Sequence, residues 1–128
     1  MSKTIMIVDV DLSFHDLYKQ MLEDTDYGII PACDGDKALM KIFAGKPDLI
    51  ILDIKLGFVN GDIFYEYLKS SPLYANIPVI IISNFHEYAK RVLKSKDKDL
   101  VIFDKTITSQ KLIEEIKARI GQKNILIY

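Results

Sequence analysis

The chain has 128 residues, enough for one domain built around a single hydrophobic core. Its 17 basic and 18 acidic residues nearly cancel, which excludes the strong positive field of many nucleic-acid-binding domains. The single cysteine excludes an internal disulfide, and no apolar run approaches the roughly 18 residues of a membrane span. The start of the chain lacks a signal-peptide pattern, so we expect a cytoplasmic protein that binds neither membranes nor nucleic acid directly.

Short aliphatic runs alternate with amphipathic segments along the chain. The first run, at residues 5–8, predicts a buried strand, and the segment after it predicts a helix capped by Asp11 or Ser13. Residues 28–33 predict an edge strand, because Pro31 cannot donate to a central ladder. The other strands are expected at residues 48–53, 77–82 and 100–103, and the other helices over residues 35–44, between Asp62 and Pro72, over residues 86–95, and from Thr108 or Ser109 to Gly121.

The pattern centres on the run Asp48-Leu49-Ile50-Ile51-Leu52-Asp53. Four consecutive aliphatic residues are too few for a helix and show no alternation, which is typical of a strand buried on both faces of a parallel sheet. Strands that alternate with helices predict right-handed crossovers and an α/β fold with helices on both faces. Ligands of such open sheets bind beyond the carboxyl ends of the strands, so Asp53 is the candidate reactive residue.

Helical spacing also predicts which side chains face the core. His15 falls on the polar side of the first helix, and we expect it to be solvated. The inner faces of the second and third helices are expected to consist of Ala38, Leu39, Ile42 and Phe43, and of Ile63, Phe64, Tyr67 and Leu68.

Four of the predicted strands end in chemically capable side chains, namely Asp9, Asp53, Ser83 and Lys105. A parallel sheet brings these ends to one edge. Carboxylates are hard oxygen ligands for Mg²⁺, a lysine neutralises phosphoryl oxygens, and a hydroxyl can donate to a further oxygen. The set suits phosphoryl transfer in which one carboxylate attacks phosphorus, because that reaction depends mainly on positioning and charge neutralisation.

From residue 3 to residue 121 the chain resembles the receiver domain of two-component response regulators. The matching pieces are Ile-Val-Asp at 7–9, Asp-Leu-Ile-Ile-Leu-Asp at 48–53, Asn-Gly at 60–61, Pro-Val-Ile-Ile-Ile-Ser at 78–83, and Lys105. The resemblance implies a flavodoxin-like, doubly wound fold: a five-stranded parallel sheet in order 2-1-3-4-5 with helices on both faces. It also implies a receiver domain over residues 1–121, with residues 122–128 as a C-terminal tail or linker stub.

The resemblance further implies that Asp53 accepts a phosphoryl group from a histidine kinase or phosphotransfer protein. Asp9, Asp53 and the main-chain carbonyl of Lys55 would hold Mg²⁺. Ser83 would hydrogen-bond the phosphoryl group and Lys105 would pair with it. Such a chain is a signalling domain and not an enzyme, because its only chemistry is its own phosphotransfer and dephosphorylation.

Phosphorylation in this family switches a protein-interaction face. We therefore expect a downstream protein partner to bind the helix that starts near His86, the fifth strand and the last helix, close to Tyr88, Lys90 and Lys94. Pairing of the chain into a homodimer is a further expectation.

The sequence departs from the family pattern at several site positions. Val10 stands where the family carries a second acidic residue that ligates the metal, which predicts weakened Mg²⁺ binding. Asn84 follows the hydroxyl residue where a small side chain is expected, and Thr106 replaces a proline after the lysine. Ile102 stands at the position of an aromatic switch residue, so coupling must run through Ser83 and its loop.

Two other interpretations remain open. The departures also fit a degenerate receiver that acts as a phosphorylation-independent docking module. Alternatively, Asp9-Val10-Asp11, Ile-Ile-Ser-Asn at 81–84, and Lys105 resemble the motifs of haloacid-dehalogenase-like phosphatases, with Asp9 as nucleophile and Asp11 as general acid. Against the phosphatase, no acidic pair ends a strand after Lys105, the chain is short for a capped core, and Asp53 would have no role.

Overall fold

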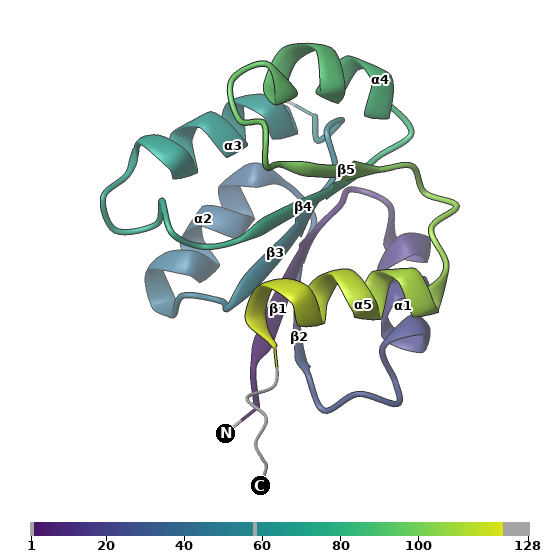
Figure 1. Cartoon of the computed structure of the whole chain (residues 1–128). Coiled ribbons are helices and arrows are strands. Elements are labelled where there is room, and N and C mark those ends of the chain that lie inside the picture. The colour runs from purple at the N-terminus through teal and green to yellow at the C-terminus, as the bar shows by residue number, and fades with distance from the viewer. Residues whose placement is uncertain (1, 58, 122–128) are drawn as a thin grey trace, which may run out of the picture.

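The computed structural model describes residues 2–57 and 59–121 and contains one five-stranded parallel sheet in the order β2-β1-β3-β4-β5 (Figure 1). The strands are β1 (Thr4–Val8), β2 (Gly28–Ala32), β3 (Leu49–Leu52), β4 (Val79–Ile82) and β5 (Val101–Phe103). The helices are α1 (Leu12–Met21), α2 (Gly35–Ala44), α3 (Gly61–Ser70), α4 (His86–Ala89), which continues as a π-helix at Lys90–Lys94, and α5 (Ser109–Ile120). The predicted fold and strand order are confirmed, with β2 at an edge. The expected tail at residues 122–128 lies outside the described residues.

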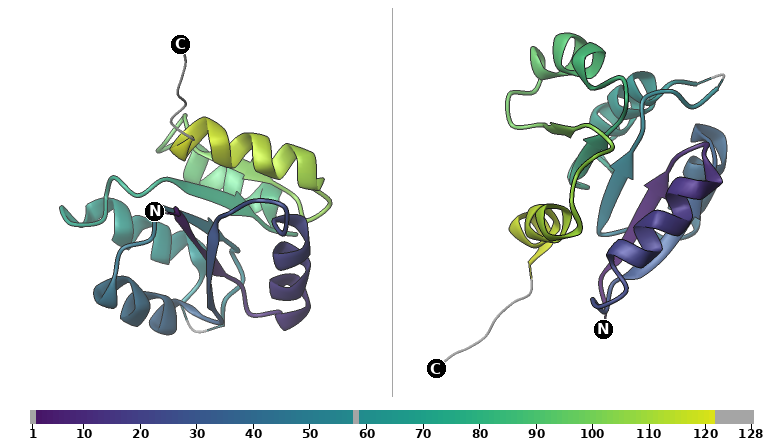
Figure 2. Two further views of the ribbon diagram at one scale, coloured as in Figure 1. Left: turned by 90° about the horizontal axis from the view of Figure 1, so that it is seen from below. Right: turned by 90° about the vertical axis from the view of Figure 1, so that its right-hand side faces the viewer.

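Helices cover both faces of the sheet (Figure 2), and the sheet separates two hydrophobic cores. Because side chains alternate along a strand, Met6 and Val8 of β1 face the helices α2, α3 and α4, whereas Ile5 and Ile7 face α1 and α5. Both faces are covered, which explains why β1, β3 and β4 read as uninterrupted aliphatic runs. Within the described residues no helix is long and apolar enough to cross a membrane.

The strand register brings the carboxyl ends of four strands level with one another. Val8 lies beside Leu52 in the β1–β3 pair, and Leu52 lies beside Ile81 in the β3–β4 pair. Ile82 in turn lies beside Phe103 of β5. The residues that follow these strands therefore emerge at the same edge of the sheet, as the sequence predicts.

The third helix is rotated relative to the prediction. Tyr65 is buried together with Phe64 and Leu68, whereas Ile63 and Tyr67 are 58% and 44% exposed. The cause is a close contact between the first residue of the helix and the main chain that follows β3. An added Cβ at Gly61 would lie 2.0 Å from the carbonyl oxygen of Asp53, so the start of α3 packs directly on the main chain at the end of β3.

Three smaller expectations about the helices are also wrong. Asn60, and not Asp62, is the N-cap residue of α3. Phe43 is 61% exposed, although its ring contacts that of Tyr74. The segment expected as one helix over residues 86–95 widens into a π-helix at Lys90, a change that its apolar spacing does not reveal because Ala89 and Leu93 are the buried residues in the structure as well.

Candidate functional site

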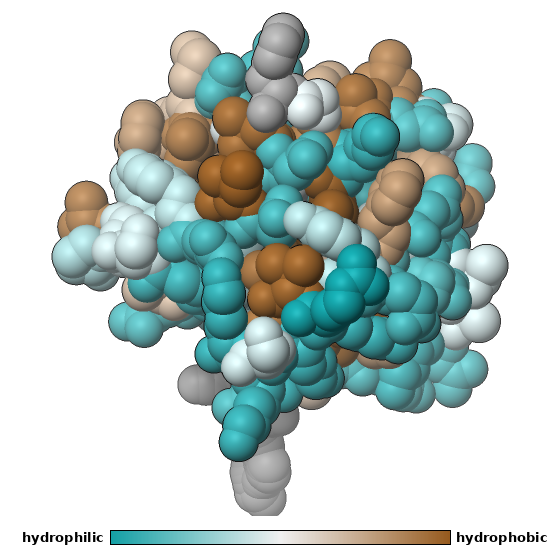
Figure 3. Space-filling view, turned by 90° about the horizontal axis from the view of Figure 1, so that it is seen from above, coloured by the Kyte–Doolittle hydropathy of each residue, from teal (hydrophilic) through white to brown (hydrophobic). Residues whose placement is uncertain are grey.

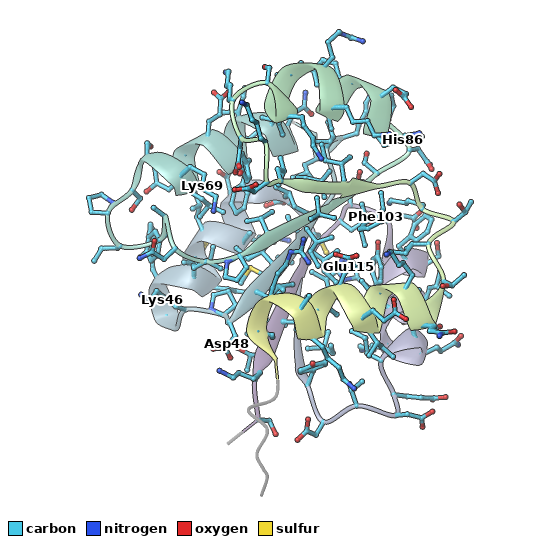
Figure 4. The ribbon with its side chains drawn as sticks, viewed as in Figure 1. Lys46, Asp48, Lys69, His86, Phe103 and Glu115 are labelled. Carbon is cyan, nitrogen blue, oxygen red and sulfur yellow. The ribbon has the colours of Figure 1, made fainter. Side chains whose placement is uncertain are left out.

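Asp53 follows β3 and is only 7% exposed. Its main-chain N–H donates to the carbonyl of Val8, which continues the β1–β3 ladder and fixes the residue beside β1. In the side chain, Oδ1 accepts a hydrogen bond from the N–H of Ile54 at 2.7 Å, and Oδ2 lies 2.9 Å from Nζ of Lys105. Asp48, at the other end of the same strand, lies at the opposite edge of the sheet, where it accepts from the N–H of Thr4 (Figure 4).

Asp9 follows β1 and is the most deeply buried acid of the site, at 1% exposed. Its Oδ1 accepts from the N–H of Asp11 at 2.9 Å, and its Oδ2 accepts from Nζ of Lys105 at 2.6 Å. Burial raises the pKa of the Asp9 carboxyl above its ordinary value, and the charge of Asp53 acts in the same direction. The hydrogen bonds from Lys105 and Asp11 oppose that rise.

Lys105 follows β5 and joins the two acids. Its side chain is 6% exposed, and its ammonium contacts Asp9 and Asp53 at the distances above. The same nitrogen lies 3.8 Å from the centre of the Phe14 ring on α1. Two carboxylates thus share one ammonium, which leaves the buried cluster one negative charge in excess.

Ser83 follows β4 and is fully buried at the same edge. Its hydroxyl oxygen accepts a hydrogen bond from the N–H of Phe85 at 3.0 Å instead of bonding either carboxylate. Asn84 beside it is exposed to solvent. Of the four strand-end side chains predicted to converge, three are therefore in direct contact, and the fourth stands at the same edge with a different partner.

The donor set for a divalent cation is small. Among the described residues, no three or more His, Cys, Asp or Glu side chains form a group that could hold a metal ion. Val10 is 55% exposed and lines a pocket of about 250 Å³ with Cys33 and Asp34. However, Asp9 and Asp53 both lie within 3 Å of one cationic atom, so a single small cation can contact both. These two carboxylates are hard oxygen ligands of the kind that Mg²⁺ prefers, and Lys55 lies two residues beyond Asp53 on the adjoining loop.

His15 is a neighbour of the site that the sequence analysis misplaced. It is 5% exposed, and its Nε2 hydrogen-bonds the carbonyl oxygen of Asp9 at 2.7 Å. The available signal was spacing, because His15 precedes the buried residues Tyr18 and Leu22 by three and seven positions. The expectation of a solvated histidine was wrong because the main-chain carbonyl of Asp9, directly after β1, provides a buried hydrogen-bond partner.

Asp11 does not occupy the place of a general acid. It is the N-cap of α1, and its Oδ1 accepts from both the N–H and the hydroxyl of Ser13, at 2.9 and 2.7 Å. These bonds lower the pKa of its carboxyl, so Asp11 holds its proton less tightly than an ordinary aspartate does. This geometry disfavours the phosphatase interpretation.

Comparisons with known proteins agree with this geometry. Residues 5–117 match the response regulator receiver domain family. The chain is 34% identical over 93 residues to the alkaline phosphatase synthesis transcriptional regulatory protein PhoP of Bacillus subtilis strain 168, covering 73% of this chain and 38% of PhoP. It is 29% identical over 121 residues to the polar-differentiation response regulator DivK of Brucella anthropi, covering 94% of this chain and 98% of DivK. The chain thus spans well under half of PhoP but nearly all of DivK.

Solved structures give the same result. The CheY-like response regulator receiver domain protein from Methanospirillum hungatei JF-1 superposes with a TM-score of 0.83 at 26% identity, over 94% of each chain. A putative response regulator from Chloroflexus aurantiacus J-10-fl also gives 0.83, at 22% identity, over 95% of this chain and 100% of that one, which shows the shared fold. The receiver family matches most of the chain, and the sheet has the strand order expected for it. These two findings rule out the phosphatase interpretation. The chain belongs to the response regulator receiver domain family of two-component signalling, whose members are signalling domains and not conventional enzymes.

Proposed function

We propose that Asp53 accepts a phosphoryl group from a histidine kinase or phosphotransfer protein and that a protein partner responds to the change. One observation carries this proposal: the buried carboxylates of Asp53 and Asp9 converge on the ammonium of Lys105, at 2.9 and 2.6 Å, beyond the carboxyl ends of a parallel sheet. A structural ion pair needs only one carboxylate per lysine. A second buried acid beside the first is a cost to stability that phosphoryl chemistry explains.

In the proposed reaction a carboxylate oxygen of Asp53 attacks the phosphorus of a phosphohistidine. The new P–O bond forms as the P–N bond breaks, and the imidazole leaves with a proton taken up from water. Lys105 neutralises charge on the phosphoryl oxygens. The oxygen of Ser83 already accepts from Phe85, so its own hydrogen is available to donate to a phosphoryl oxygen.

Mg²⁺ is proposed as the cofactor, held by Asp9, Asp53 and the carbonyl of Lys55. Bound there, it would neutralise the charge that develops on the transferred group. Val10 supplies no carboxylate to this site, so we propose that affinity is lower than with a second acid.

The proposed receiver domain comprises residues 1–121, and its partner surface includes α4, β5 and α5. Lys90 and Lys94 are exposed on the π-helix, whereas Tyr88 hydrogen-bonds Asp62 of α3 at 3.0 Å and so leans toward α3. The side of the molecule that carries α4 shows apolar patches separated by polar side chains, a mixture suited to a regulated interface and to a homodimer contact alike (Figure 3).

A phosphorylation-independent docking module is the second candidate. Val10, Ile102 and Thr106 favour it, because they remove a metal ligand, an aromatic switch and a proline from the family pattern.

Mass spectrometry after incubation with acetyl phosphate and Mg²⁺ separates the two candidates. We expect one phosphoryl group on the wild-type chain, mapped to Asp53, and none on Asp53→Asn. Asp11→Asn is the matched control, because asparagine also caps helices well and Asp11 has no proposed part in the transfer. A wild-type chain that never gains phosphate would favour the docking module, and phosphate that maps to Asp9 would contradict the assignment of Asp53.

A further inference from the structure

The ammonium of Lys105 has a third contact that is not an acid. Its nitrogen lies 3.8 Å from the centre of the Phe14 ring, well within the distance of a cation–π contact. An ammonium has three hydrogens, and Asp9 and Asp53 occupy two of them. The aromatic face therefore covers the remaining side of a cation whose side chain is 94% buried, and cation–π attraction strengthens as water is excluded.

The ring itself is held in place. Phe14 lies in the first turns of α1, close to the Asp11 cap that fixes where the helix begins. Its ring packs against that of Tyr18, with centres 6.3 Å apart and planes tilted by 39°. Tyr18 is 2% exposed, so Phe14 rests on a fixed neighbour and presents a defined face to Lys105.

We propose that Phe14 is a positioning residue that holds the ammonium of Lys105 over the phosphoryl-acceptor site. Both charged partners of Lys105 change when the site works: Asp53 gains a phosphoryl group, and Asp9 is a proposed metal ligand. The aromatic contact is the one that persists through these changes. Since no acid stands at position 10 to hold a metal more firmly, the placement of Lys105 has more influence on the transfer rate. The effect on rate rests on the proposed function, whereas the placement of the ammonium does not.

The test is progressive fluorination of the Phe14 ring, by incorporating 4-fluoro-, 3,5-difluoro- and 3,4,5-trifluorophenylalanine. Fluorine withdraws electron density from the face of the ring and so weakens its attraction for a cation. The shape of the ring stays nearly constant, so a role in packing alone would be unaffected. The first readout is the exchange rate of the Lys105 ammonium hydrogens with water, followed by nitrogen-15 NMR in the unphosphorylated protein. We expect exchange to accelerate with each fluorine. We also expect phosphorylation by acetyl phosphate to slow in the same order, by about tenfold for the trifluoro ring.

Phe103 provides the matched control, because Lys111 lies 5.9 Å from its ring centre at a more exposed position. The same fluorination at Phe103 should change neither Lys105 exchange nor phosphorylation. The proposal would be overturned if the exchange rate at Lys105 did not change with the number of fluorines on Phe14. It would also be overturned if the wild type were phosphorylated and the phosphorylation rate did not change along the same series. If the wild type takes up no phosphate, the proposed function fails, and the exchange series still decides whether Phe14 positions the ammonium.

Discussion

Replacing Gly61 by alanine should damage the fold and the acceptor site together. The new methyl group would lie 2.0 Å from the carbonyl oxygen of Asp53, 2.9 Å from its carbonyl carbon and 2.9 Å from Cα of Ile54. The obstructing atoms all belong to the main chain, so no side-chain rotation relieves the clash. The Gly61 N–H also donates to the carbonyl of Ile54 at 2.6 Å, which ties the two segments together.

Relief requires the start of α3 to move by about 1 Å from the end of β3. Overpacking of a rigid site costs about 1–3 kcal/mol, and a main-chain clash belongs at the upper end, so we expect Gly61→Ala to lower the free energy of unfolding by about 3 kcal/mol. For a domain of this size that corresponds to a melting temperature lower by about 12 °C. Phosphorylation of Asp53 should slow as well, because its main chain moves with the clash.

Two other glycines separate this reasoning from a general effect of the added methyl group. An added Cβ at Gly45 meets no atom within 4 Å, and its backbone is extended at φ 177°, so Gly45→Ala should change stability by less than about 0.5 kcal/mol. Gly57 has open space but φ 93°, so Gly57→Ala should cost about 1–2 kcal/mol through backbone strain alone. Urea denaturation of the three variants tests the order. A Gly61→Ala protein as stable as Gly45→Ala would refute the close-contact argument.

Two further predictions concern the charges of the site. Burial raises the pKa of Asp9 above 3.8, so the native chain binds its proton more tightly than the unfolded chain, and the contribution of Asp9 to stability declines as the pH rises from about 4 through the raised pKa. Asp9→Asn should therefore stabilise the unphosphorylated protein at pH 7 and give no gain below pH 4 in urea denaturation; an equal effect at both pH values would contradict the role of ionisation. Val10→Asp should tighten Mg²⁺ binding roughly tenfold, since an attraction of about 4 kcal/mol per charge pair at 4 Å is mostly offset by the water it replaces. Calorimetric titration that gives equal affinities for both proteins would show that position 10 does not face the metal.

The sheet was predictable because its signals are local. Runs such as Leu49–Leu52 and Val79–Ile82 are continuous in sequence and buried on both faces, and each is bounded by a polar residue or proline. Thr108 caps α5 through its side chain, and Gly121 ends that helix with φ 45°, as the sequence predicts. The convergence of Asp9, Asp53 and Lys105 followed from the same information, because parallel strands in this order leave their carboxyl ends at one edge.

The errors come from contacts between segments that are distant in sequence or whose side-chain direction the spacing leaves open. The rotation of α3 is set by Gly61 resting on the Asp53 main chain, and no periodicity within residues 61–70 reports that contact. His15 is buried because the Asp9 carbonyl turns toward α1. Helical spacing places Phe14 four residues before the buried Tyr18, but it does not reveal that the ring contacts Lys105, which lies 91 positions further along the chain.

Under the proposed function, the valine at position 10 affects the electrostatics of the site both before and after phosphorylation. A second acid there would add a negative charge near Asp9 and Asp53, and the added repulsion would destabilise the metal-free protein. With Val10, two carboxylates share Lys105, and every carboxylate oxygen of Asp9 and Asp53 already has a hydrogen-bond donor within 3 Å. Under the proposed function, phosphorylation would add negative charge that Lys105 must neutralise with less help from a metal. The placement of that single ammonium, between two acids and the face of Phe14, is therefore where substitutions should most strongly alter phosphoryl transfer in this chain.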